Sequence, residues 1–265
     1  MTDESPGYEG RRRDGVLRVD RPGTEWLSSG PAGGRVRADC AYNVSVPDGW
    51  TRTDLETYVD ERLERAGFAE PIGGQPGTVS ERPPSLLTGV DIADARGARC
   101  GSVTAYATAG ISNPAALPMA PTGGSLPSSV SDAATGEGIS SDCPGSGTVN
   151  VIVGTTRALG DGALANLLAV AAEAKAATLL SITGVPGTTT DAVVAGHDPA
   201  GRPAAFTGSA TPVGAATRAC VREAIRASLE AHYEGCDATV PASVEDAEYG
   251  VSTDVRADVF LPDRC

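Results

Sequence analysis

The residues best suited to chemistry lie between positions 171 and 191. Lys175 is the only lysine in the 265-residue chain, and it stands within the apolar stretch AVAAEAKAATLL. Glu173 comes two residues before it, and Asp191 follows three threonines in GVPGTTTDAVVAG. A carboxylate can serve as a general base, and small hydroxyls beside it can bind polar ligand groups. The pattern therefore favours a site for a polar ligand.

Lys175 is expected on the buried face of a long helix. The segment from about Asp161 to Ile182 is rich in Ala and Leu and lacks proline, which predicts a helix. At 100° per residue Lys175 falls in the middle of an apolar stripe, whereas Glu173 projects from the opposite side. Two readings stay open: the amine is buried and needs a partner, or the side chain lies at an edge and its amine reaches water. The stripe consists of Leu164, Leu168, Ala171, Lys175, Thr178, Leu179 and Ile182.

The composition excludes some classes of partner. The formal net charge is −13, and twenty of the 21 basic residues are arginines. Nucleic acids and anionic membranes bind through clusters of Lys and Arg, so we expect neither as a partner. Many carboxylates and almost no lysine indicate a cytosol of high salt, where screening weakens the repulsion between acidic groups.

Nothing in the sequence indicates secretion or a membrane. The N-terminus has no apolar stretch of the signal-peptide type, and we expect no segment long enough to span a bilayer. The cysteines are scattered and form no C-x-x-C pair, which is typical of reduced thiols and speaks against structural zinc. We expect a cytoplasmic protein. The six cysteines are Cys40, Cys100, Cys143, Cys220, Cys236 and Cys265.

Composition also predicts a single domain, preceded by a disordered tail and followed by an extension. Residues 1–13 are polar and charged and are expected to be a disordered tail. Residues 14–234 form the expected domain, interrupted at 112–147 by a long flexible loop rich in Pro, Gly and Ser. Residues 235–265 form a C-terminal extension, in which VSTDVRADVF alternates like a late strand.

The periodicities predict an α+β fold with a mixed or antiparallel sheet and helices packed on it. A capping box at Thr53–Glu56 starts one helix that stops at Gly67, and Thr211-Pro212 starts another that runs to Gly235. Strands dominate the first half and helices enter singly, unlike a regular βαβ alternation. The expected strands are 15–20, 36–46, 86–92, 101–108, 148–154 and 190–196.

A series of short segments resembles the adenosylcobinamide amidohydrolases, the CbiZ family of corrinoid salvage. GTVNVIV, AAEAKAA, GTTTDAVV and GSATPVG follow one another as in that family, and WLSSGPAGG, NVSVP, LLTGVDI and TAGISNPA precede them in the same order. The resemblance covers about residues 15–234 and is closest to haloarchaeal members. It departs at Ala210, where the family often has histidine, and it leaves out 235–265.

The resemblance implies hydrolysis of the amide that joins aminopropanol to the corrin ring of adenosylcobinamide, which gives adenosylcobyric acid. It implies no cofactor and no catalytic metal, because the cobalt belongs to the substrate. A corrinoid-binding protein without catalysis and an amidase of other specificity remain alternatives. Self-association into a homo-oligomer stays open.

For such an amidase the catalytic candidates are Lys175, Glu173, Asp191 and Thr190. In the simplest scheme Asp191 or Glu173 activates a water molecule, while Lys175 stabilises the oxyanion or relays the proton. Thr190 and Asn150 would hold the substrate carbonyl. The candidates for substrate binding are Ser28, Ser29, Gly33, Gly34, Asn43, Thr108, Asn113, Asn150, Thr189 and Ser209.

A side-chain nucleophile is the competing scheme. Ser28, Ser29, Thr108 or one of the threonines at 188–190 would then attack directly. The two histidines, His197 and His232, are expected to be structural or surface groups, and no G-x-S-x-G motif is present. P-loop and Rossmann signatures are also missing from the sequence, so we expect neither ATP nor NAD to be used.

Overall fold

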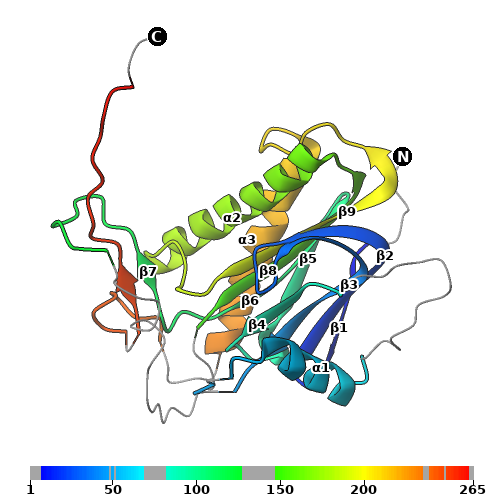
Figure 1. Ribbon diagram of the computed structural model, residues 1–265, viewed down its shortest axis with the longest axis horizontal. Helices are drawn as coiled ribbons and strands as arrows, with labels where there is room; N and C mark the ends of the chain where they lie inside the picture. The colour runs from blue at the N-terminus through cyan, green and yellow to red at the C-terminus, as the bar shows by residue number, and fades with distance from the viewer. Residues whose placement is uncertain are drawn as a thin grey trace.

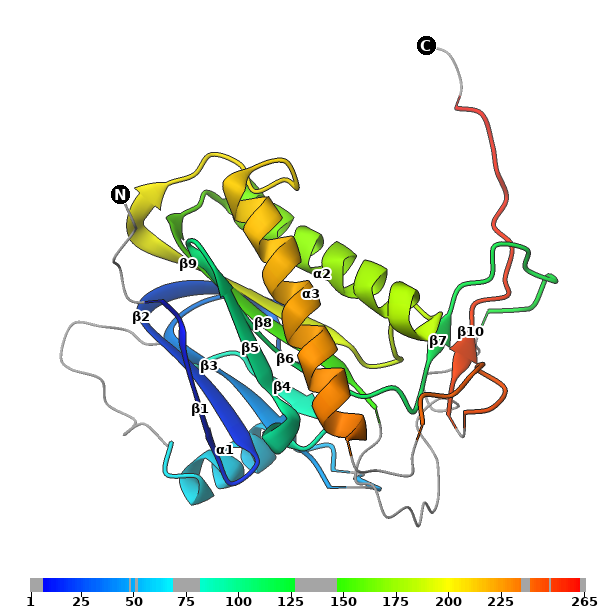
Figure 2. The same ribbon diagram turned by 180° about the vertical axis from the view of Figure 1, so that it is seen from behind.

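The computed structural model describes residues 7–47, 49–50, 52–68, 82–126, 147–234, 239–247 and 249–262. A mixed sheet forms the centre of the molecule, with helices α2 and α3 side by side on one face (Figures 1 and 2). The prediction of an α+β fold built on a mixed sheet is confirmed.

The sheet has the strand order β4-β3-β2-β9-β8-β6-β5, and β1 pairs with β2 beside this path. Neighbours are antiparallel except for two parallel pairs, β3 with β4 and β8 with β9. The strands are β1 (Glu9–Arg13), β2 (Val16–Ser28), β3 (Gly34–Ser45), β4 (Ser85–Thr88), β5 (Arg96–Cys100), β6 (Val103–Ala109), β8 (Val149–Ala158) and β9 (Ala192–Pro203).

Each expected strand overlaps an observed one, with shifted ends. β2 is much longer than 15–20, because a register shift between Asp20 and Thr24 lets it continue its pairing with β3. Only the first part of the expected strand 86–92 is extended, because β4 ends at Thr88. A short 3-10 helix, η1 (Ile92–Asp94), follows it. Asp91 caps this turn by accepting a hydrogen bond from the Ala93 amide.

Three α-helices lie where they were predicted: α1 (Leu55–Arg65), α2 (Asp161–Thr183) and α3 (Pro212–Tyr233). Thr211 caps α3 by accepting a hydrogen bond from the Gly214 amide, as its sequence predicts. The prediction of a capping box at the start of α1 is wrong. The N-cap residue is Asp54, no side chain caps this end, and the Asp54 carboxylate instead binds Arg52.

Helix α2 joins the parallel strands β8 and β9 and ends at Gly184, whose φ of +78° is a left-handed conformation suited to glycine. Within the described residues it is the one helix long and apolar enough to cross a membrane, contrary to the expectation of none. Half of the 18-residue stretch of α2 that meets this criterion is buried inside the protein. Packing in a core therefore accounts for part of its apolar surface.

The sheet has a core on each face. Between the sheet and α2 and α3, the small side chains of β6, β8 and β9 meet Leu164, Leu167 and Ile225. The other face curls on itself, so that Trp26 of β2, Leu86 of β4 and Ile152 of β8 share one cluster. Helix α1 covers the outer strands through Tyr58 and Val59. The curl brings strands together that are far apart in the sheet order.

The expected tail at 1–13 is wrong for the part that the structure describes. Residues 9–13 form β1, and Tyr8 is 1% exposed, with its ring in edge contact with Trp26. The tyrosine hydroxyl donates to the Thr155 carbonyl oxygen, while Tyr106 donates to the carbonyl oxygen of Tyr8. Charged side chains face outward along β1, which hid the strand in the sequence. Residues 1–6 lie outside the described part.

The described parts of the expected loop and of the C-terminal extension pair with each other. The short strands β7 (Ala115–Ala116) and β10 (Val251–Ser252) are parallel neighbours. The predicted strand over VSTDVRADVF thus amounts to two residues. Asp254 then accepts hydrogen bonds from the backbone and hydroxyl of Thr122. Residues 127–146 and 235–238 lie outside the described part.

Candidate active site

Lys175 and Asp191 form a buried ion pair. Lys175 projects from α2 towards the sheet, and its amine donates to Oδ2 of Asp191, which directly precedes β9. Each side chain is 10% exposed. Gly187 permits this contact, because a Cβ there would lie 2.5 Å from Asp191 Oδ2 and 3.0 Å from Lys175 Nζ. The buried reading of Lys175 is therefore confirmed.

Four donors surround the Asp191 carboxylate. Oδ2 accepts from Lys175 and from the Thr188 amide at 3.0 Å. Oδ1 accepts from the Val149 amide at 2.8 Å and from the Thr188 hydroxyl at 2.5 Å. A carboxylate has about four acceptor positions, so all are used. The Thr188 hydroxyl, the Asp191 carboxylate and the Lys175 amine thus form a continuous line of hydrogen bonds.

Two further polar pairs involve Thr189 and Thr190, which stand between Thr188 and Asp191 in the chain. The hydroxyls of Thr148 and Thr190 lie 3.1 Å apart, and because only one can donate to the other, a second hydroxyl proton is left for a ligand. Asn113 Nδ2 donates to Thr189 Oγ1 at 2.6 Å. Asn113 Oδ1 is buried and has no partner among the described residues. Such an atom is ready to accept a hydrogen bond from a bound ligand.

A buried network joins the same region to the curled side of the sheet. Asn150 Nδ2 donates to Asn43 Oδ1 at 3.1 Å and to the Leu87 carbonyl oxygen at 2.7 Å. Asn43 donates to Thr108, and Thr108 donates to Thr88. These residues come from β3, β4, β6 and β8. Since Asn150 Oδ1 also accepts from the Ala192 amide, the network reaches the residue next to Asp191.

We refer to these groups together as the polar cluster. It consists of Lys175, Asp191, Thr188, Thr189, Thr190, Thr148, Asn113, Asn43, Asn150, Thr108 and Thr88.

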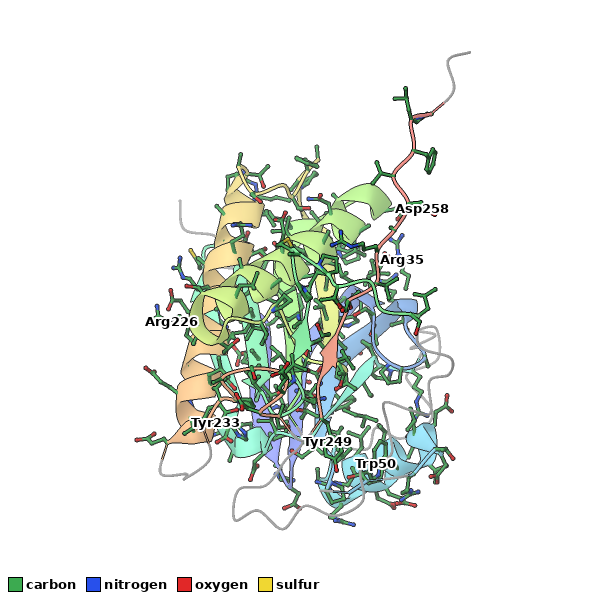
Figure 3. All side chains as sticks on the ribbon, turned by 90° about the vertical axis from the view of Figure 1, so that its left-hand side faces the viewer. Arg35, Trp50, Arg226, Tyr233, Tyr249 and Asp258 are labelled. Carbon is green, nitrogen blue, oxygen red and sulfur yellow. The ribbon has the colours of Figure 1, made fainter. Side chains whose placement is uncertain are left out.

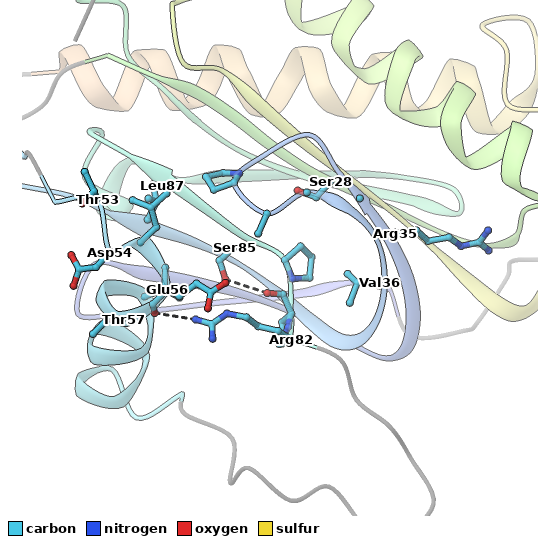
Figure 4. Close-up of a pocket in the computed structure, with 18 residues that line it drawn as sticks. Ser28, Arg35, Val36, Thr53, Asp54, Glu56, Thr57, Arg82, Ser85 and Leu87 are labelled. Atoms are coloured by element: carbon cyan, nitrogen blue, oxygen red, sulfur yellow. Dashed lines mark hydrogen bonds between the residues drawn. The ribbon is translucent and has the colours of Figure 1, made fainter. Parts of the chain in front are cut away.

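A cavity of about 650 Å³ lies between the start of α1 and the strands β2–β4 (Figure 4). The glycine-rich loop after β2 forms one wall, the first turn of α1 forms another, and the approach to β4 forms a third. In the loop, Gly34 has φ +119°, and a Cβ at Gly33 would lie 2.4 Å from the Ser28 carbonyl oxygen, so both positions require glycine. Ser28 lines the cavity, and its hydroxyl accepts from the Gly30 amide.

The cavity and the polar cluster share a wall. Leu87 lines the cavity while its carbonyl oxygen binds Asn150. Gly30 packs so closely that a Cβ there would lie 3.8 Å from the Cβ of Ala192, the neighbour of Asp191. Leu87, and the packing of Gly30 against Ala192, are therefore the contacts by which the cavity wall meets the cluster.

Three of the proposed site residues do not join the cluster in the proposed way. Glu173 lies on the opposite side of α2, 65% exposed, and pairs with Arg218, because residues two apart on a helix face different ways. Ser209 is exposed in the turn before α3, near the start of α2, where Thr207 binds the Ala163 carbonyl oxygen. Ser29 uses its hydroxyl to continue the β2–β9 ladder at Val193.

Three threonines of the cluster were not selected as site residues from the sequence. Thr88 and Thr148 stand within LLTGVDI and GTVNVIV, and Thr188 was considered only among several hydroxyls. A signal was present for two of them, because Thr88 ends β4 and Thr148 directly precedes β8, whereas Thr188 lies in the turn before β9. Which of these ends meet depends on the curl of the sheet, and a period of two in the sequence does not show it.

The two histidines lie outside the polar cluster. His197 Nδ1 accepts from the Leu159 amide, and His232 Nδ1 lies 2.9 Å from Asp94 Oδ2. Tyr233, next to His232, exchanges hydrogen bonds with the backbone of Ile111, and burial raises the pKa of its hydroxyl. In the part of the chain that the structure describes, no three His, Cys, Asp or Glu side chains form a group that could hold a metal ion.

Comparison with known proteins gives a consistent result. The family model described as adenosylcobinamide amidohydrolase matches residues 1–237. A protein of Halobacterium salinarum with the name adenosylcobinamide amidohydrolase is 54% identical over 255 residues, which cover 96% of this chain and all of that protein. This match extends into 235–265, which the sequence motifs left out. The crystal structure of the PH0078 protein from Pyrococcus horikoshii aligns over 86% of this chain and 80% of its own, at 14% identity and a TM-score of 0.38.

Proposed function

The chain belongs to the adenosylcobinamide amidohydrolase family, and from this premise we propose that the polar cluster cleaves the substrate amide while the adjoining cavity holds the corrinoid. The reaction is hydrolysis of the amide between aminopropanol and the corrin ring, which releases adenosylcobyric acid in corrinoid salvage. The observation that carries the proposal is the line of hydrogen bonds from Thr188 through Asp191 to Lys175 beside the cavity.

The nucleophile in this proposal is the Thr188 hydroxyl. It already donates to Asp191 Oδ1, so the carboxylate is in place to take its proton as the oxygen attacks the amide carbon. A water molecule would first have to displace one of the four donors on Asp191. Lys175 acts as a positioning residue, because its amine fixes the carboxylate from the other side.

The same groups can complete the reaction. Asp191 passes the proton from Thr188 to the nitrogen of aminopropanol, which leaves as the C–N bond breaks and an ester forms on Thr188. Water then attacks the ester, gives its proton to Asp191, and the proton returns to Thr188 as the acid is released. Asn113 Oδ1, which has no partner among the described residues, would accept from the N–H of the substrate amide.

Charge on the carbonyl oxygen needs a donor in the tetrahedral state. The Thr148–Thr190 pair has a hydroxyl proton available for it. The corrin ring would lie with one edge in the 650 Å³ cavity, against the glycine-rich loop, whose bare backbone a flat macrocycle can approach closely.

The direct test is mass spectrometry of the enzyme quenched during turnover of adenosylcobinamide, measured intact and after digestion into peptides. The proposal predicts a covalent adduct of the cobyric acyl group on the peptide that contains Thr188. Thr188→Ser should keep the adduct, whereas Thr188→Val, which has a similar volume, should lose both adduct and turnover. Thr183→Val is the matched control, because this hydroxyl binds the Leu179 carbonyl oxygen on α2. Full turnover by Thr188→Val would assign the attack to water.

Release of free aminopropanol separates this function from the other two candidates. A corrinoid carrier would bind adenosylcobinamide and release none, and an amidase of other specificity would cleave a small amide while leaving adenosylcobinamide intact. We favour the corrinoid amidase because the cavity and the cluster adjoin each other.

We further propose a high-salt cytoplasm as the working environment, with no cofactor and neither nucleic acid nor membrane as a partner. The net charge of −13 and the similarity to a protein of Halobacterium salinarum support the high salt. Dialysis from concentrated KCl into dilute buffer should unfold the enzyme, since unscreened carboxylates repel one another. Equal stability in both buffers would contradict this environment.

A further inference from the structure

A basic groove runs along the outer surface between α2 and α3. Its volume is about 390 Å³. One wall is charged and the other is largely apolar. Arg218, Arg222 and Arg226 of α3 form the first wall, and Ala174, Ala177, Thr178, Ser181 and Ile182 of α2 form the second.

The three arginines follow one another at successive turns of α3. Arg218 pairs with Glu173 at 3.0 Å and Arg222 with Glu223 at 2.6 Å, which leaves each guanidinium partly open to water, 42% and 55% exposed. On the α2 side, Ile182 is 49% exposed. In a chain of net charge −13, such a groove suits a segment that carries a carboxylate beside apolar side chains.

The C-terminal arm has this composition. Residues 251–256 are fixed to the body, since Val251 binds the Pro114 carbonyl oxygen and Arg256 binds that of Pro121. Beyond them the chain runs away from the helices and the sheet (Figure 1). Asp258 is exposed, and the following Val259, Phe260 and Leu261 are 98%, 82% and 88% exposed. Three adjacent apolar side chains in water are unfavourable unless another surface covers them.

We propose that the arm of one copy, residues 257–262, lies in the α2–α3 groove of a second copy. In an extended segment Asp258 and Phe260 project to the same side, so the carboxylate can meet an arginine while the ring covers Ile182. Six extended residues span roughly 20 Å, and the eight residue steps from Arg218 to Arg226 span about 12 Å of helix, so the arm is long enough.

The position of the arm favours exchange between copies. In Figure 3, Asp258 on the arm and Arg226 on α3 lie on opposite sides of the molecule. Two copies related by a twofold axis can each place an arm in the groove of the other, which closes the assembly at a dimer.

Sedimentation across a wide protein concentration range, in the KCl at which the enzyme is active, tests the proposal. The wild type should show a dimer that dissociates on dilution. Phe260→Ser with Leu261→Ser should raise the dissociation constant at least about tenfold, because apolar burial is lost. Arg222→Glu with Arg226→Glu should weaken the dimer too. Asp258→Arg combined with Arg226→Glu should recover part of the lost affinity.

Leu126→Ser is the matched control, since Leu126 is 77% exposed but lies outside both arm and groove. All variants should keep turnover of adenosylcobinamide, which shows that they are folded. A wild type that stays monomeric at every concentration overturns the proposal, as does a dimer that the arm variants leave unchanged.

Discussion

Lys175 of α2 donates to Asp191 at the start of β9, and both side chains are only 10% exposed. The contact joins the helix between two parallel strands to the loop that leads back into the sheet. Its position gives the pair a role in both stability and turnover.

Lys175→Met should therefore reduce both properties. The change leaves the Asp191 carboxylate buried without its cation, which costs about 3–5 kcal/mol in comparable cases. We expect the free energy of unfolding in denaturant titrations at fixed KCl to fall by that order, and kcat to fall because the carboxylate is no longer held towards Thr188. Glu173→Gln on the same helix is the control. Its pair with Arg218 is exposed, so stability should change by about 1 kcal/mol or less. Equal effects of the two substitutions would contradict a special role for Lys175.

Thr190→Val should lower kcat and leave KM nearly unchanged. The proposed hydroxyl acts on the oxygen only as charge develops, and loss of one such donor costs about 10²–10³ in kcat. Steady-state kinetics with adenosylcobinamide measure the two constants separately. A higher KM with unaltered kcat would instead assign Thr190 to ground-state binding.

Tyr8→Ala should destabilise the protein by about 3 kcal/mol, in the range for removal of a buried aromatic side chain. Tyr8 is 1% exposed, packs on Trp26 and binds the Thr155 carbonyl oxygen, so the loss leaves a cavity beside β8. The control is Arg11→Ala on the neighbouring β1, which removes only an exposed ion pair between Arg11 and Asp20 of β2. If the region were a loose tail, both variants would match the wild type in thermal unfolding.

The stability should also fall as the pH drops below about 6.5. Burial lowers the pKa of His197 from its ordinary value of 6.5, so the unfolded chain takes up the proton first. The contribution of the neutral ring is complete above pH 6.5 and is lost as the pH falls from there through the lower pKa of the folded state. Chemical unfolding between pH 5 and 8 measures the slope. His197→Gln should flatten it, and an unaltered slope would assign the effect to other groups.

The sequence predicted the helices well, and it placed Lys175 on an apolar stripe, although it left open whether the amine is buried or reaches water at an edge. It also predicted Asp191, Asn43, Asn150 and Thr108 as site residues, and the structure brings them together. It did not reveal that Glu173 would pair with Arg218, since that depends on the neighbouring α3. Strand β1 was missed because its side chains are exposed and arginines dominate its composition, while the buried anchor is Tyr8, the residue before the strand.

Because Lys175 is the sole lysine and is held inside α2, a protease that cuts only after lysine has one peptide bond to attack, between Lys175 and Ala176. That bond is protected while the helix is intact. The rate at which the chain is cut into two fragments therefore reports how readily α2 opens, without any label or engineered residue.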